Sequence, residues 1–173
     1  MDQKQATSEE THDPIFLCDA MLGGLARWLR VAGYKAEFDV HFSDGELVRK
    51  SLDEDKVLLT SDSGIPDRYA VSEGLIVYVF IPRDLDVIEQ LGYVLGEMDL
   101  PLKDPRCMEC GGELAKVELQ GVIDEVPEKV RHRCSEYWQC RRCDKVYWHG
   151  THWESISERL DRAVQIANSD ICQ

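Results

Sequence analysis

The chain of 173 residues is 43% hydrophobic, 31% charged and 8% aromatic, with a formal net charge of -13. That apolar fraction is too high for a disordered chain, and the twelve glycines and six prolines exclude a collagenous or low-complexity architecture. The longest apolar run, residues 75–81, is far shorter than the roughly 20 residues that cross a bilayer, so we expect neither a membrane span nor a membrane partner.

The N-terminal residues 1–14 are polar and acidic, with neither the basic start nor the apolar stretch of a signal peptide. We therefore predict a disordered leader over 1–14 and a cytoplasmic location. The chain has seven cysteines, and four of them stand in two CxxC pairs. In a cytoplasmic chain this pattern indicates metal binding before disulfides.

Strand and helix patterns alternate from residue 15 to residue 100. Short apolar runs predict strands at 15–18, 36–38, 56–60 and 75–81. Apolar residues at helical spacing predict helices after the first strand, after Ser43 and after Asp84, and a helix of one or two turns between the last two strands. Ser43 and Glu46 form a capping-box signature, and Gly33 is the predicted C-terminal cap of the first helix. This alternation predicts a mostly parallel sheet with helices on both faces.

The pattern changes after residue 100. Recurring proline predicts a linker over 101–106. Residues 107–153 contain both CxxC pairs and a β-rich stretch, and apolar residues at helical spacing predict a C-terminal helix and tail over 154–173. We therefore expect one α/β domain over 15–100 and a small metal-binding module over 107–153.

The paired cysteines predict a structural zinc site in that module. Each CxxC places two thiolates on one tight turn, and two such turns complete a tetrahedral four-sulfur site, here Cys107, Cys110, Cys140 and Cys143. A module this small buries little apolar surface, so the ion would supply much of its folding free energy. Cys134, His132, His149 and His152 lie nearby but are not needed as ligands. Redox-active thiol pairs are the alternative interpretation.

Acidic residues follow each predicted strand of the first domain. They are Asp19, Asp44, Asp62 and Asp84. Ligands of open parallel sheets bind at the carboxyl ends of the strands, so we expect these side chains to converge. Any one of them alone is more often a helix cap or a first-turn charge that complements the helix dipole. Clustered carboxylates need a compensating cation such as Mg²⁺ or Mn²⁺, which points to phosphoryl hydrolysis.

Basic residues gather in two places. Six of them crowd the second half within a short span: Lys129, Arg131, Arg133, Arg141, Arg142 and Lys145. This patch either contacts phosphate or is a solvated face that balances the acidic half of the chain. Arg27 and Arg30, on the first predicted helix, either hold substrate phosphate near the acidic residues or form ion pairs with solvent-facing partners.

Several motifs together resemble one family: FLCDAMLGGLARWLRVAGY, SDGEL, VLLTSD, EQL, the paired CxxC motifs and VYWHGTHW. Over about residues 15–153 the chain is similar to the Mut-seven C-terminal ribonuclease family. The resemblance implies an α/β fold in which a PIN-like nuclease domain with a mostly parallel sheet precedes a β-rich zinc ribbon and the C-terminal helix. It also implies metal-dependent cleavage of RNA and zinc on the four paired cysteines.

The same resemblance assigns roles to individual residues. Asp19, Asp44 and Asp62 fall where the family's acidic residues stand. Glu46 and Asp84 are the candidates for the helical glutamate that PIN-type sites commonly include. One departure affects the site, because the family's Thr-Arg-Asp is replaced here by Thr60-Ser61-Asp62.

The resulting hypothesis is a Mg²⁺- or Mn²⁺-dependent ribonuclease whose zinc ribbon holds single-stranded RNA. The RNA contacts expected are Arg27, Arg30, Arg141, Arg142 and His152. Trp148, His149, His152 and Trp153 could stack on bases, while the alternative for the two tryptophans is packing of the ribbon against the nuclease domain. The alternative function is a non-catalytic adaptor that binds RNA or protein on a retained PIN-like scaffold. The acidic pI of about 4.7 also permits a basic protein partner.

Overall fold

The computed structural model describes residues 13–65 and 69–169. The leader predicted over 1–14 lies outside the described residues except for its last two positions, as does the end of the predicted tail, residues 170–173. Among the described residues, no helix is both long and apolar enough to cross a membrane.

The first half of the chain forms a four-stranded parallel sheet. Its strands are β1 (Ile15–Cys18), β2 (Lys35–Phe38), β3 (Val57–Thr60) and β4 (Tyr78–Phe80), in the order β2-β1-β3-β4. This confirms the predicted mixed α/β fold with a parallel sheet. The strand predicted at 75–81 is wrong in its length, because the backbone N–H of Leu75 bonds to the Ala70 carbonyl and so ends a helix instead of pairing with β3.

Helices cover both faces of this sheet. They are α1 (Gly23–Val31), α2 (Asp44–Glu54), α3 (Tyr69–Ser72) and α4 (Val87–Glu97). Side chains alternate between the two faces along a strand. Phe16 and Cys18 of β1 belong to the core cluster of α1 and α4, whereas Leu17 packs with α2 and α3. Because β1 is apolar on both faces, helices pack against both sides of the sheet and give the domain three layers.

The predicted helix ends are confirmed at α1 and α2. Ser43 and Glu46 form a capping box at the start of α2, with both hydrogen bonds present. Gly33 follows the end of α1 at a φ of 102°, and its N–H bonds back to the Arg30 carbonyl. These signals depend on residues close in sequence, which is why the sequence alone located them.

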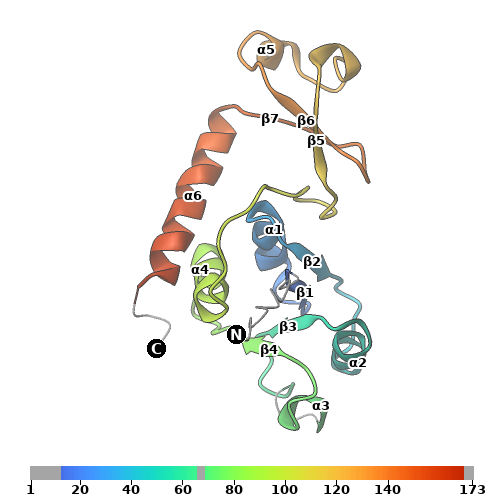
Figure 1. The fold of residues 1–173 in the computed structure, drawn as a ribbon, viewed down its shortest axis with the longest axis vertical. Coiled ribbons are helices and arrows are strands. Elements are labelled where there is room, and N and C mark those ends of the chain that lie inside the picture. Colours follow the sequence, from blue (N-terminus) through green and yellow to red (C-terminus); the bar gives the residue numbers. More distant parts are fainter. Residues whose placement is uncertain (1–12, 66–68, 170–173) are drawn as a thin grey trace, which may run out of the picture.

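The second half of the chain forms an antiparallel sheet and a long helix. The strands β5 (Leu114–Val117), β6 (Tyr137–Cys140) and β7 (Val146–Trp148) pair in that order, with η1 (Leu119–Gly121) and α5 (Glu128–Arg131) between β5 and β6. Helix α6 (Thr151–Ala167) starts three residues before the predicted 154 and runs back along α4 (Figure 1). It contributes Ile156, Leu160 and Ala163 to the core cluster of α1 and α4.

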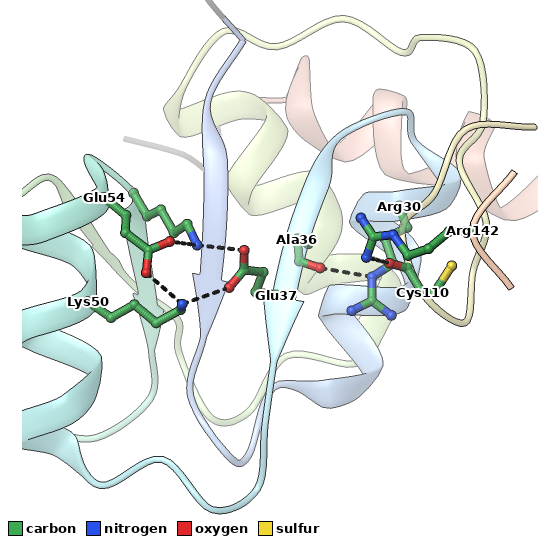
Figure 2. Close-up of polar contacts among 8 residues, drawn as sticks. Arg30, Ala36, Glu37, Lys50, Glu54, Cys110 and Arg142 are labelled. Atoms are coloured by element: carbon green, nitrogen blue, oxygen red, sulfur yellow. Dashed lines mark hydrogen bonds and ion pairs between the residues drawn. The ribbon is translucent and has the colours of Figure 1, made fainter.

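A network of four charges ties α2 to the sheet. Lys56 is only 5% exposed and contacts Glu37 and Glu54 at 2.5 Å each. Lys50 pairs with the same two carboxylates at 3.4 and 2.7 Å. Figure 2 shows this network on one side of β2. Hydrogen bonds from Lys50 and then Lys56 lower the pKa of Glu54 to about 2.

Candidate functional site

Two aspartates follow the adjacent strands at which the strand order of the sheet reverses. After β1 the chain forms β2 on one side of β1, then crosses to form β3 on the other side. Such a switch point leaves a crevice at the carboxyl ends of the two adjacent strands, here β1 and β3. Asp19 directly follows β1, and Asp62 comes two residues after β3.

Thr60 joins these two positions. Its hydroxyl donates to Asp19 Oδ2 at 2.7 Å and accepts from the backbone N–H of Asp62 at 2.9 Å. Asp19 also accepts from the backbone N–H groups of Ser61 and Met21, at 2.8 and 2.9 Å. Asp19 is 5% exposed, and three donors hold its carboxylate in one orientation. Asp62 is less buried, and its Oδ1 accepts from the N–H of Gly64 at 2.8 Å.

The departure at Ser61 has a structural consequence. Ser61 is 3% exposed, and its hydroxyl donates to the Ile81 carbonyl at 2.9 Å, which joins β3 to the end of β4. Arg83 donates from Nε to the Ser61 carbonyl at 2.8 Å. The guanidinium of Arg83 therefore lies against the backbone of Ser61, although the two residues are 22 positions apart in the sequence.

The other predicted acids lie at the same edge with different surroundings. Asp44 is the half-buried first residue of α2, and Asp84 is exposed between β4 and α4. The hydroxyl and the N–H of Ser43 both donate hydrogen bonds to Glu46. These bonds lower the pKa of Glu46, and the bond from the hydroxyl contributes most. Glu46 therefore caps α2. Asp39, directly after β2, accepts from the N–H of His41.

The acidic residues do not form a preformed three-carboxylate cluster within the described part of the chain. Among the described residues, the four paired cysteines are the only group of three or more histidine, cysteine, aspartate or glutamate side chains whose ligand atoms lie close enough to share one metal ion. Mg²⁺, however, is commonly held by one or two carboxylates together with phosphate oxygens and water. The donor set of Asp19 and Asp62 fits that type of site.

The four paired cysteines come together as predicted. The Sγ atoms of Cys107, Cys110, Cys140 and Cys143 all lie within 4.8 Å of one another. Cys107 and Cys143 are 3.6 Å apart, and Cys110 and Cys140 are 3.4 Å apart. A tetrahedral ion with sulfurs at ~2.3 Å would separate them by ~3.8 Å. The donor set thus suits a four-sulfur metal site such as that of zinc.

Hydrogen bonds to the sulfurs support this arrangement. The N–H groups of Gly112 and Arg142 lie 3.4 Å from the Sγ atoms of Cys110 and Cys140, and the Tyr147 hydroxyl lies 3.1 Å from Cys107 Sγ. Burial raises the pKa of Cys107, but the Tyr147 hydroxyl and nearby backbone N–H groups outweigh it and hold the pKa at about 6. A Cβ at Gly112 would lie 2.7 Å from Cys140 Sγ, so this turn requires glycine.

Two arginines hold the first cysteine turn in place. Arg30 of α1 donates from Nε to the Ala36 carbonyl and from Nη1 to the carbonyls of Met108 and Glu109, at 2.9, 3.0 and 2.7 Å. Arg142 donates to the Cys110 carbonyl at 2.8 Å. Figure 2 shows the Arg30–Ala36 and Arg142–Cys110 contacts on the side of β2 away from Glu37. Arg30 thus links α1, β2 and the cysteine turn.

The remaining predicted RNA contacts lie on exposed surface. Arg27, Arg141, Arg142 and His152 are all exposed. Trp148 and Trp153 are half-buried beside the antiparallel sheet, where His149 stacks on Trp153 with ring centroids 4.6 Å apart. Arg27, Arg141, Arg142 and His152 remain predicted RNA contacts, and Arg142 also has a contact within the cysteine site. Trp148 packs against the buried cluster that contains Val122, Val126 and Tyr137.

Sequence reasoning missed the residues that organise both sites. Thr60 and Tyr147 stand inside strands, where a polar side chain carries no distinctive spacing. Arg83 is distant in sequence from Asp62, so only strand pairing reveals their proximity. Asp39 had a usable signal, because it directly follows a strand as Asp19 does, but that strand pattern is short and interrupted by Glu37.

Comparison with known proteins identifies the family. Neither the curated proteins nor the solved structures contained a match to the chain. The model of the Mut7-C RNAse domain, in contrast, matches residues 14–160. This range includes the four cysteines and the carboxyl end of the parallel sheet with Asp19, Asp44, Asp62 and Asp84, here called the acidic edge. The chain therefore belongs to the Mut7-C RNAse domain family, and its function is ribonuclease-like.

Proposed function

We propose that the protein is a Mg²⁺- or Mn²⁺-dependent ribonuclease with a PIN-like nuclease domain over 15–100 and a zinc ribbon over 107–153 that assists RNA binding. The junction of Asp19, Thr60 and Asp62 at the switch point of the parallel sheet carries this proposal. Membership of an RNAse domain family supports RNA as the substrate.

In this proposal Asp19 and Asp62 hold the catalytic ion, with Asp44 as a third ligand from the start of α2. When bound, a hard divalent cation supplies positive charge that offsets the charge on the phosphate and favours ionisation of the attacking water. The three donors to Asp19 fix the orientation of its carboxylate, so the ligand would be in place before the ion binds. Arg83, at the Ser61 backbone, adds a positive charge for phosphate where the family pattern has arginine.

The zinc ribbon has a positioning role in the same proposal. A structural zinc ion is held by Cys107, Cys110, Cys140 and Cys143. The close approach of their four sulfur atoms supports this assignment. Arg30 joins the first cysteine turn to α1, which begins four residues after Asp19. An RNA strand on the ribbon would therefore be held at a defined position relative to the acidic edge.

Cleavage of labelled single-stranded RNA in the presence of Mn²⁺ tests the proposal. We expect Asp19→Asn and Asp62→Asn to lower the rate by roughly 100-fold or more, because each change removes a negatively charged ligand of the proposed catalytic ion. Asp161→Asn changes an exposed aspartate on α6 and is the matched control. Cleavage by Asp19→Asn at the wild-type rate would show that the assigned site is wrong.

A non-catalytic adaptor is the second candidate. The absence of a three-carboxylate cluster among the described residues favours it, as does Ser61 in place of arginine. It predicts that RNA binding survives Asp19→Asn, weakens with Arg141→Ala and is never followed by cleavage. Arg141 is preferred to Arg142 for this test because Arg142 also contacts the Cys110 carbonyl. Metal-dependent cleavage that disappears with Asp62→Asn would eliminate the adaptor.

A further inference from the structure

A large groove lies beside the antiparallel sheet, outside the acidic edge. Its volume is about 740 Å³, and its wall is formed by β7, the first turn of α6, the end of α1 and the chain before Cys107. The aromatic part of the wall consists of Trp138, Tyr147, Trp148, His149, His152 and Trp153. Most of these residues come from the VYWHGTHW motif, to which neither the acidic site nor the zinc site assigns a role beyond Tyr147.

Three rings of the groove are neighbours: His149 stacks on Trp153, and Trp138 lies against His149 with an angle of 35° between the planes. The centroids of Trp138 and His149 are 4.3 Å apart, and those of His149 and Trp153 are 4.6 Å apart with an angle of 19° between the planes. Planar ligands bind to such stacks by adding another ring at the same spacing. Nucleobases are planar and stack on aromatic side chains with little dependence on sequence.

The charges in the wall favour an uncharged ligand group. Two carboxylates, Asp104 and Glu109, are balanced by two cations, Arg106 and Lys145. Lys145 pairs directly with Glu109 at 2.8 Å, and Arg106 donates to the Gly111 carbonyl. A phosphate would gain little attraction in this groove, whereas a base would bury its faces against apolar rings.

The groove and the acidic edge lie at opposite ends of helix α1. A smaller hollow of about 320 Å³ is lined by Gly23, Gly24 and Arg27 of α1 and shares Glu109 with the groove. Helix α1 has nine residues, so it spans ~13 Å between the end near Asp19 and Val31, which lines the groove. Arg27 is exposed midway along this path. The span corresponds to about four stacked nucleotides, and to fewer in an extended strand.

We propose that the groove binds an unpaired base of single-stranded RNA, whose backbone runs along α1 past Arg27 to the acidic edge. This proposal rests on the proposed function, because it takes RNA as the substrate. It assigns base stacking to Trp153, whose ring already stacks on His149, and phosphate contact to Arg27. An apolar peptide segment and a second copy of the chain are the other occupants that the experiment distinguishes.

Binding is measured by fluorescence anisotropy of labelled single-stranded RNA in the Asp19→Asn background, so that cleavage does not interfere. We expect Trp153→Ala to weaken binding by about 5- to 150-fold, with little dependence on salt, because it removes stacking and no charge. Arg27→Ala should weaken binding and reduce the slope of log affinity against log salt by about one. Tyr78→Ala removes a comparable exposed ring from β4 and should leave binding unchanged.

A second arm alters the RNA and compares abasic RNAs on one and the same protein, so that differences between RNAs do not reflect differences in folding. Single abasic positions are introduced one at a time along the RNA. We expect one position to weaken binding to the Asp19→Asn protein by the factor seen for Trp153→Ala, and to have no further effect on the Trp153→Ala protein. The non-additivity would show that this base and Trp153 act together.

Several outcomes would overturn the proposal. Equal binding of all abasic RNAs, or equal effects of Trp153→Ala and Tyr78→Ala, would exclude a base in the groove. A change in the sedimentation coefficient with Trp153→Ala, with RNA binding unaffected, would assign the groove to self-association. An apolar peptide that binds the groove and is not displaced by RNA would assign it to a protein partner. If the abasic coupling holds but no RNA is cleaved, only the catalytic proposal fails. If cleavage occurs without the coupling, only the groove proposal fails.

Discussion

The Thr60 hydroxyl donates a hydrogen bond of 2.7 Å to Asp19 Oδ2. The Thr60 hydroxyl oxygen also accepts a hydrogen bond from the Asp62 backbone N–H. One completely buried side chain therefore contacts both the Asp19 carboxylate and the backbone of Asp62. Thr60→Val removes the hydroxyl with little change in shape. We expect it to raise the Mn²⁺ concentration needed for half-maximal RNA cleavage by about 10- to 100-fold, as loss of groups that orient metal ligands does.

Thr60→Ser is the matched variant for this prediction. It keeps the hydroxyl and should retain most of the wild-type metal requirement, although loss of the methyl group costs some stability. Denaturation midpoints of both variants separate loss of fold from loss of orientation. An unchanged metal requirement in folded Thr60→Val would show that Asp19 and Asp62 do not depend on this contact.

The Tyr147 hydroxyl supports the cysteine site from 3.1 Å. Tyr147→Phe removes this donor to Cys107 and keeps the ring, so we expect zinc affinity to fall by about tenfold or more. Competition with a chelator, followed with a zinc-sensitive dye, measures the change. Tyr78→Phe on β4 is the control. Release of zinc from both variants at the wild-type chelator concentration would count against a role for this hydroxyl.

The charge network around Lys56 makes stability depend on pH. The pKa of Glu54 is lowered from 4.5 to about 2 by Lys50 and then Lys56, so its contribution is complete above pH 4.5 and is lost as the pH falls to about 2. Glu54→Gln should therefore be less stable than wild type at pH 7, with a difference that shrinks toward pH 2. Urea midpoints between pH 7 and pH 2.5 measure this.

Glu97→Gln, which changes an exposed glutamate on α4, is the control for that series. Its difference from wild type should stay small across the whole pH range. A Glu54→Gln difference that is the same at pH 7 and pH 2.5 would mean that the network does not lower this pKa.

Helices α4 and α6 approach closely at Gly92. A Cβ there would lie 2.7 Å from the Ile166 Cβ and 2.8 Å from the Ala163 carbonyl oxygen. Gly92→Ala should therefore destabilise the fold by about 1–3 kcal/mol through overpacking. Gly45→Ala in α2 meets nothing within 4 Å and should be neutral or stabilising by up to ~1 kcal/mol. Chemical denaturation of the two variants makes the comparison, and equal midpoints would contradict the close packing.

Local features were predictable from the sequence because neighbouring residues produce them. The first three strands, the capping box of Ser43 and Glu46, and the cap at Gly33 are confirmed close to their predicted positions. The grouping of the four cysteines was also predictable, since each CxxC turn brings two sulfurs together without help from the rest of the chain. The length of β4 was not, because Leu75 bonds to helix α3 instead of the sheet.

By itself, then, the sequence determined the strand and helix alternation, the cysteine pairs and the family resemblance, which all depend on short-range spacing. Only the tertiary structure decided which distant groups meet: Thr60 with Asp19, Arg30 with the cysteine turn, and Trp138 with His149. These contacts depend on the order of the strands and on the packing of α1 and α6. Neither the strand order nor the packing can be predicted from the spacing of residues along the chain.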